Sequence, residues 1–398
     1  MQLPETVIVG MARTPFGRLG GSLADIKSTD LGAVAIKGAL ERAGVEGGDV
    51  DYVIMGQVIT GGVGQMPARQ ATLKAGLPLS VPSLNVNKVC ISSISALVTA
   101  DQIIRCGDAD LIVAGGMESM SQGCYYVTKG RYGYRMGNGT LVDGMVHDAL
   151  WCAINDWHMG EGTDLVAEEF GTTREQQDLW SVRSQQRAAE AQKAGKFAEE
   201  IVPVEIKKKK EVVLFDTDEH IRADTTLEAL AKLKPAFRKE GGSVTAGNAS
   251  GINDGAACLV VASREKAEKL GLKPLATVVS HGMVADRPDY LATVPANSIM
   301  KALEKIGKSV DDVSLFEMNE AFAAVCWHSS VMLGLDPETA ETSNVNGGAI
   351  ALGHPVGASG ARIVMSLVNE LARRGGGLGA AAICGGGGQG DAVIVKVD

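Results

Sequence analysis

The sequence predicts an α/β protein made of two duplicated, layered halves, with a further segment inserted into the first half. Two observations lead to this fold class. Strand-like apolar runs alternate with helix-like segments along most of the chain, and the second part of the chain repeats the pattern of the first. A chain of 398 residues is long enough for two or three core-forming units.

An internal repeat is the clearest sign of the duplication. A helical run that ends at 39–42 leads to an apolar run that ends at Gln57, and the same pattern recurs from Ala302 to Glu320. Asn85-Val-Asn87 recurs at 344–346, and 111–116 recurs at 381–386. The offset changes between these matches, so small insertions must lie in the turns. Order and spacing are otherwise kept, which chance is unlikely to supply.

The elements of the first half follow from periodicity. Residues 29–43 and 91–105 carry apolar side chains at helical spacing, whereas 51–56, 83–87 and 110–114 are short apolar runs typical of strands. Alternation of this kind favours a mostly parallel sheet with helices on its faces. Two such units are expected to be related by a pseudo-twofold axis, and a site between them could draw residues from both.

The middle of the chain, about 120–250, does not belong to the repeat. It is richer in polar and charged residues, and it contains a long helical candidate, 173–194, and a lysine run, Lys207–Lys210. We expect the lysines to face water rather than a ligand phosphate. The first half then resumes at 251–261, which is expected to be its last strand. The predicted units are 1–121 with 251–272 for the first half, 122–250 for the inserted loop domain, and 273–398 for the second half.

Composition excludes several classes of protein. A net charge of −9 argues against a general nucleic-acid or membrane-surface binder, and no apolar run is long enough to span a membrane. The seven cysteines stand singly without a Cys-x-x-Cys pair, which argues against a disulfide scaffold or zinc ribbon and favours a reducing compartment. The N-terminus lacks the pattern of a signal peptide, so a cytoplasmic protein is expected. No histidine spacing suggests a metal site.

Three residues could carry chemistry together. Cys90 follows a strand and precedes a helix, where free N–H groups and the helix dipole are expected to lower the pKa of a thiol. His354 lies in a tight glycine–proline frame, Gly353–Gly357, and could act as the base for a cysteine nucleophile. Cys384 ends a strand and opens a run of four glycines. Two thiols and one imidazole suit acyl transfer followed by deprotonation of a carbon acid.

Each of these residues has a structural alternative. Cys90 could be a small buried residue of a turn, and His354 could only stabilise its loop. The glycines after Cys384 could donate N–H groups to an oxyanion or form a flexible turn. Asn319, at the end of another apolar run, could hold a water molecule or cap a helix.

Seven motifs together resemble the thiolase family. The resemblance extends from Ala12-Arg-Thr-Pro-Phe-Gly17 to the C-terminus and is most similar to the bacterial, biosynthetic-type acetyl-CoA acetyltransferases. The motifs are Asn87-Lys-Val-Cys90, Gly115-Gly-Met-Glu-Ser119, Asn248–Ala256, Asn319-Glu-Ala-Phe322, Asn346-Gly-Gly348, Gly353–Gly360 and Cys384–Gly388.

The resemblance implies a thiolase-like fold and a role for each motif residue. Cys90 would be the acylated nucleophile, and His354 would take its proton and then help to form an oxyanion hole for the enolate. Cys384 would remove the α-proton of the second acetyl-CoA. Asn319 would hold the water that completes the enolate hole, and the N–H groups of Cys90 and Gly386 would form a second hole.

The resemblance also implies coenzyme A contacts, mostly from the inserted segment: Leu150, His158, Met159, Arg222, Phe237, Ala246, Ser250, Ala321 and Phe322. Two stretches depart from the family pattern. The family often has small residues and glycine after the nucleophile, whereas this chain has Ile91-Ser-Ser-Ile94. After Gly160 it has Glu161-Gly-Thr-Asp164 in place of the usual pattern. The first change is expected to alter packing behind the site, and the second affects the pantetheine wall.

The activity implied is that of an acetyl-CoA C-acetyltransferase of lipid metabolism, which condenses two acetyl-CoA molecules to acetoacetyl-CoA through an acetyl-cysteine with ping-pong kinetics. Coenzyme A would be substrate and product, with no separate cofactor, and the chain would form a homotetramer or homodimer. The alternatives are a degradative 3-ketoacyl-CoA thiolase for longer chains, and a non-catalytic acyl-CoA-binding protein on the same fold.

Overall fold

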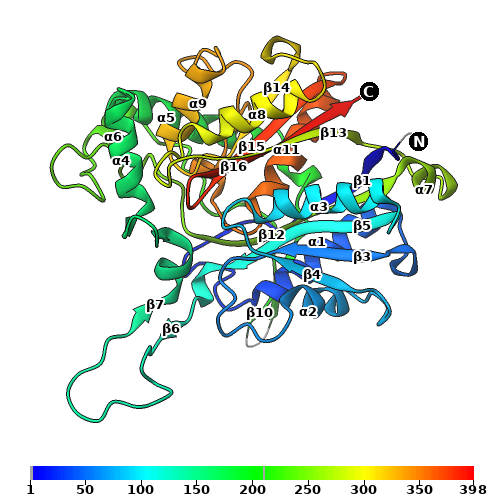
Figure 1. The fold of residues 1–398 in the computed structure, drawn as a ribbon, viewed down its shortest axis with the longest axis horizontal. Helices are drawn as coiled ribbons and strands as arrows, with labels where there is room; N and C mark the ends of the chain where they lie inside the picture. Colours follow the sequence, from blue (N-terminus) through cyan, green and yellow to red (C-terminus); the bar gives the residue numbers. More distant parts are fainter. Residues whose placement is uncertain (1–2, 209–210) are drawn as a thin grey trace.

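The computed structural model describes residues 3–208 and 211–398. Its centre is a ten-stranded sheet to which both halves contribute (Figure 1). The strand order is β14-β15-β16-β13-β1-β12-β5-β3-β4, and β2 pairs with β12. The strands are β1 (Thr6–Arg13), β2 (Gly17–Arg18), β3 (Tyr52–Gly56), β4 (Ser83–Val86), β5 (Leu111–Ser119), β12 (Asn253–Ser263), β13 (Ala276–Ala285), β14 (Leu315–Met318), β15 (Gly377–Gly385) and β16 (Gln389–Val397).

Helices cover both faces of the two halves. The first half carries α1 (Ser28–Ala43), α2 (Pro67–Lys74), α3 (Ser92–Cys106) and α7 (Arg264–Lys269). The second half carries α8 (Val294–Glu304), α9 (Ala323–Met332), α10 (Ala349–Leu352) and α11 (Ser359–Arg373). One core cluster contains side chains of both α3 and α11 together with strands of both halves. These two helices therefore form a shared middle layer, while α1 and α8 pack in separate clusters on the outer faces.

The duplication predicted from the sequence is visible in the strand order. The series β3, β5, β12 and β1 in the first half matches β14, β15, β16 and β13 in the second. The halves join where β1 pairs antiparallel with β13, from Thr6 opposite Val278 to Ile8 opposite Ala276. The buried helix α3 precedes β5 in the first half, and its counterpart α11 precedes the matching strand β15 in the second.

The sheet is mixed rather than mostly parallel, so that part of the sequence prediction is wrong. Only β3 with β4 and β5, and β14 with β15, are parallel pairs within the central sheet. The reason is connection length. A short turn joins β15 to β16 and allows only an antiparallel hairpin, whereas helix-linked strands can run parallel.

The chain leaves the sheet after Ser119 and returns at Asn253, where β12 pairs with β5 from Asp254 opposite Ser119 onward. Among the described residues between these points lie short strand pairs and three α-helices, of which the helices stand beside the two halves in Figure 1. They are β6 (Tyr125–Tyr126), β7 (Val142–Asp143), β8 (Trp151–Cys152), β9 (Trp157–His158), α4 (Met159–Glu169), α5 (Arg174–Lys193), β10 (Val204–Lys208), β11 (Glu211–Phe215) and α6 (Leu227–Ala231).

Two sequence predictions concern the exposure of the lysine run, Lys207–Lys210, and the presence of a membrane-spanning segment. Lys207 is exposed on β10, while positions 209 and 210 of the lysine run lie outside the described residues. One segment, Val89–Cys106, is long and apolar enough by composition to cross a membrane. It forms α3 and supplies Ile94, Leu97 and Ile104 to the shared core cluster, which is the behaviour of a core helix.

Candidate active site

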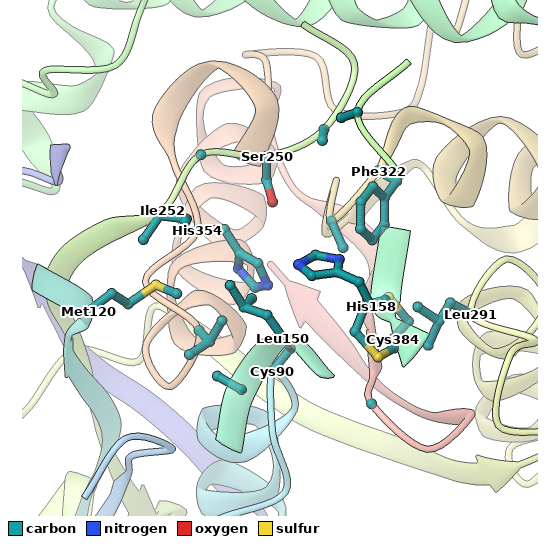
Figure 2. A pocket seen from close by; sticks show the side chains of 18 of the residues that line it. Cys90, Met120, Leu150, His158, Ser250, Ile252, Leu291, Phe322, His354 and Cys384 are labelled. Carbon is teal, nitrogen blue, oxygen red and sulfur yellow. The ribbon is translucent and has the colours of Figure 1, made fainter. Parts of the chain in front are cut away.

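A cavity of about 450 Å³ opens where the two halves and the inserted segment meet. Cys90, His354 and Cys384 all line it, and Figure 2 shows the three side chains around a common space. Cys90 comes from the start of α3, His354 from the loop before α11, and Cys384 from the end of β15. Its remaining wall is mainly apolar.

Cys90 is held by a strained turn. Val89, the residue before it, has a φ of 52°, in a left-handed region that a β-branched side chain rarely adopts. The turn closes through the Ile91 N–H, which donates to the Lys88 carbonyl at 3.2 Å, and the helix then begins at Ser92. The tight turn sets the half-buried thiol at the cavity wall rather than inside the helix.

The bulky residues after Cys90 pack behind the site. Ile91 and Ile94 are fully buried. A Cβ at Gly385 would lie 2.8 Å from Ile91, and one at Gly360 would lie 2.7 Å from Ile94. These glycines leave the room that the two isoleucines fill, so the departure from the family pattern is accommodated by close packing.

The backbone of His354 is fixed by Asn253, the first residue of β12. The His354 N–H donates to Asn253 Oδ1 at 3.0 Å, and Asn253 Nδ2 donates to the Gly17 carbonyl at 2.9 Å. Gly353 is required at the contact, because its φ is 104° and a Cβ there would lie 2.3 Å from Asn253 Cγ. The loop therefore depends on a residue from the first half.

Ser359 determines which nitrogen of His354 is free. The two side chains are buried, with 2.6 Å between His354 Nδ1 and Ser359 Oγ. The Ser359 hydroxyl has a carbonyl acceptor in Pro355 at 3.1 Å, and on that basis we assign the proton of the His354–Ser359 contact to Nδ1. Nε2 then carries the lone pair, and it has no partner among the described residues. This tautomer suits a general base at Nε2.

Burial keeps all three reactive groups uncharged at rest. It lowers the pKa of His354 to about 3, with a smaller contribution from the positive charge of Arg362. It raises the pKa of Cys90 to about 12 and raises that of Cys384 further. The expectation that the helix start lowers the Cys90 pKa is wrong for this state, because burial outweighs the favourable backbone N–H.

Asn319 is the one predicted catalytic residue that does not line the cavity. It follows β14 and is completely buried, and neither amide atom, Nδ2 or Oδ1, has a hydrogen-bond partner in the described part of the chain. Buried amides are nearly always paired. Its main chain is held in place, since the Asn319 N–H donates to the Ala382 carbonyl at 2.9 Å.

Glu118 is a functional-site residue whose role the sequence did not indicate. Its carboxylate accepts from the N–H groups of Val58 (2.9 Å), Ile59 (3.1 Å) and Gly357 (3.0 Å). It thereby ties β5 to the His354 loop. Burial raises its pKa to about 7 despite these three donors. Two signals were available: a glutamate inside an otherwise apolar run, and its place in the motif Gly115–Ser119.

Two family models match this chain: the thiolase N-terminal domain over residues 6–265 and the thiolase C-terminal domain over 272–397. The chain belongs to the thiolase family. A probable acetyl-CoA acetyltransferase of Mycolicibacterium smegmatis is 52% identical over 98% of this chain and all of its own length. Acetyl-CoA acetyltransferases of Pseudomonas aeruginosa and Cupriavidus necator are each 50% identical, over 100% and 99% of this chain and all of their own lengths.

In this thiolase the nine residues expected to contact coenzyme A all line the cavity: Leu150, His158, Met159, Arg222, Phe237, Ala246, Ser250, Ala321 and Phe322. Gly386 lines it as well. The rings of His158 and Phe237 stack at 4.4 Å, and Phe322 meets Phe237 edge-on at 6.4 Å between centroids. Sequence reasoning missed other lining residues, notably Met120, His220, Ile252, Leu291 and Val356.

The second departure from the family pattern supports this wall from behind. Asp164 of α4 accepts from the N–H groups of Ser243 at 2.7 Å and Val244 at 2.8 Å. It therefore fixes the segment that leads from Phe237 to Ala246. Residues 161–164 do not line the cavity themselves. Their effect on the cavity wall is indirect, through the hydrogen bonds that Asp164 accepts from the backbone of Ser243 and Val244.

Proposed function

We propose that this thiolase condenses two molecules of acetyl-CoA to acetoacetyl-CoA and coenzyme A by a ping-pong mechanism. One observation carries the proposal: two thiols and a neutral imidazole with a free Nε2 line one largely apolar cavity. Its relatives named acetyl-CoA acetyltransferase support the choice of substrate. Coenzyme A is a substrate in this scheme, and the residues named below require no further cofactor.

In the first half-reaction the Cys90 thiol gives its proton to His354 Nε2, and the sulfur attacks the thioester carbonyl. The new bond is C–S to Cys90, and the bond that breaks is C–S to coenzyme A. Cys384 gives its proton to the departing coenzyme A sulfur. The enzyme is left with an acetyl group on Cys90, an imidazolium at His354 and a thiolate at Cys384. The attack is thus driven by positioned proton transfer, which is typically worth about 10²–10⁴-fold in rate.

In the second half-reaction the Cys384 thiolate removes an α-proton from a second acetyl-CoA. The negative charge moves to the thioester oxygen, beside the imidazolium of His354. The enolate carbon then attacks the acetyl carbonyl and expels the Cys90 sulfur, which recovers its proton from His354. All three groups return to their neutral resting forms. Hydrogen-bond donors aimed at such an oxygen are worth roughly 10²–10³-fold each.

We further propose that Asn319 completes the enolate hole through a water molecule. Its two unpartnered amide atoms support the proposal, because one could accept from and the other donate to such a water. A hole built this way would combine His354 from the α11 side with Asn319 from the end of β14.

Active-site substitutions test the activity. Cys90→Ala is expected to abolish the acetyl-enzyme seen by intact mass spectrometry after addition of acetyl-CoA. Cys106→Ala is the matched control, since Cys106 is an exposed cysteine at the end of the same helix. Thiolysis rates with 3-ketoacyl-CoA of increasing chain length then separate this activity from a degradative thiolase. Acetylation of Cys90→Ala at the wild-type rate would disprove the assignment.

We also propose that the chain forms a homotetramer or a homodimer. The loop between β6 and β7 projects from the body in Figure 1 and exposes large side chains, with Tyr132 92% and Met136 96% exposed. Exposed apolar residues in one projecting segment are typical of interaction sites. Light scattering of the wild type and of a Tyr132→Ser, Met136→Ser variant tests this assembly, with a monomeric wild type as the contrary result.

A further inference from the structure

A buried arginine behind the cavity has no role in the scheme above. Arg362 of α11 is completely buried and does not line the cavity. Within the described part of the chain its only charged contact is with Glu317 of β14, from Nη1 to Oε1 at 2.7 Å. Nε and Nη2 have no hydrogen-bond partner among the described residues. A buried guanidinium that leaves donors unpaired is costly to the fold.

The place of this arginine in the fold connects the two parts of the enolate site. Ser359 and Arg362 lie three positions apart on α11 and therefore on one side of the helix. Ser359 orients His354, and the partner of Arg362, Glu317, lies two residues before Asn319. The Arg362–Glu317 pair thus bridges the element that positions His354 and the strand that positions Asn319.

The positive charge of Arg362 also reaches the reactive groups. Burial is the main cause of the lowered His354 pKa, and the positive charge of Arg362 lowers that pKa further. Burial raises the pKa of Cys326, and Arg362 opposes that shift. The Cys326 thiol in turn donates to the main-chain carbonyl of Asn319 at 3.6 Å. The guanidinium is therefore close enough to act electrostatically on both sides of the site.

The charge of Glu317 offsets that of Arg362 only in part. Burial raises the Glu317 pKa to about 8, against the opposing effect of Arg362, and the nearby carboxylate of Glu320 adds to the rise. This shift favours the neutral form of Glu317, while arginine stays charged. Glu317 then neutralises only part of the positive charge behind the oxygen that becomes negative in the second half-reaction.

We propose that Arg362 is a positioning residue for the condensation half-reaction, supplying a fixed buried positive charge behind His354 and Asn319 that favours the enolate. This inference rests on the proposed function. The first half-reaction forms its negative charge at the opposite hole, near the N–H groups of Cys90 and Gly386, and it protonates His354, which the positive charge of Arg362 opposes. Acetylation should therefore gain no assistance from Arg362, whereas the enolate of the second half-reaction should. The predicted signature is a selective loss of enolate formation.

The test compares two steps in each variant. Acetylation of Cys90 is followed by rapid-quench mass spectrometry, and enolate formation by exchange of the acetyl-CoA methyl protons in D₂O. Arg362→Met, which removes the charge and keeps a long side chain, should slow exchange by roughly 10- to 100-fold and acetylation by less than about 3-fold. Arg362→Lys keeps the charge and should restore most of the exchange.

Glu317→Gln distinguishes charge from packing, and it also serves if Arg362→Met does not fold. It keeps an oxygen acceptor for Arg362 and removes only the negative charge. The proposal requires exchange within about 3-fold of the wild type, or faster. If Glu317→Gln slows exchange as much as Arg362→Met, or if both steps fall equally in Arg362→Met, the pair is only a structural anchor and the proposal is wrong. Failure of the wild type to acetylate Cys90 would instead reject the proposed function.

Discussion

Removing the hydroxyl of Ser359 tests how far the tautomer of His354 matters. In Ser359→Ala, Nδ1–H loses the acceptor that lies 2.6 Å away in a fully buried setting. A buried donor left unpaired costs about 1–3 kcal/mol. If the tautomer with its proton on Nδ1 becomes less stable by this amount, Cys90 acetylation should slow by roughly 5- to 150-fold.

The loss should appear in acetylation itself, because the alternative tautomer places a proton on Nε2 and cannot accept one from Cys90. Rapid-quench mass spectrometry of the acetyl-enzyme measures that rate directly. Ser298→Ala is the matched control, since Ser298 is also fully buried and its hydroxyl donates to a proline carbonyl, that of Pro295, at 2.8 Å on α8. Both variants should lose similar stability, and only Ser359→Ala should lose rate. Equal acetylation rates in Ser359→Ala and the wild type would refute the tautomer argument.

Three further outcomes are expected. Cys384→Ala should still acetylate Cys90, but more slowly because the departing coenzyme A sulfur loses its proton donor. It should exchange α-protons at least about 100-fold more slowly, and exchange at the wild-type rate would show that Cys384 is not the base. Gly116→Ala should destabilise the fold by more than about 2 kcal/mol in urea unfolding, since the new Cβ would lie 1.9 Å from the Gly357 carbonyl oxygen, whereas Gly48→Ala, with nothing within 4 Å, should change little. Burial acts to raise the Glu370 pKa, but hydrogen bonds from Asn346, Arg374, Lys196 and Arg373 outweigh it and lower the pKa to about 2. The ionised carboxylate therefore stabilises the fold above the unfolded pKa of about 4.5, and this stabilisation is lost as pH falls towards 2. The stability difference between wild type and Glu370→Gln should therefore shrink on acidification, and a constant difference between about pH 6 and pH 3.5 would contradict the assignment.

The duplication, and the three candidate residues that the structure brings to one cavity, could be predicted because both leave local marks in the sequence. The helix–strand alternation gave the positions of α1, β3, α3 and β5, and the glycine-rich frames around His354 and Cys384 gave two of the three reactive groups. Strand direction could not be predicted, because β1, β12 and β13 find their neighbours through long-range pairing that periodicity does not report.

The residues that orient the site were harder to recognise. Ser359, Asn253 and Arg362 look like ordinary polar residues in the sequence, and only the fold shows that one binds Nδ1, one binds the His354 N–H and one is buried without full pairing. The state of Cys90 was missed for the same reason. Its position before a helix is local information, whereas the burial that controls its pKa arises from side chains distant in sequence.

The uncharged resting site has a consequence for the lifetime of the enzyme. Oxidants and alkylating agents attack thiolates far faster than thiols. Because burial raises the Cys90 pKa to about 12, this sulfur rests mainly as the thiol. In the proposed mechanism the thiolate forms only when the neighbouring imidazole takes the proton during acyl transfer. The burial that keeps this thiol neutral should therefore also slow its reaction with oxidants and alkylating agents between turnovers.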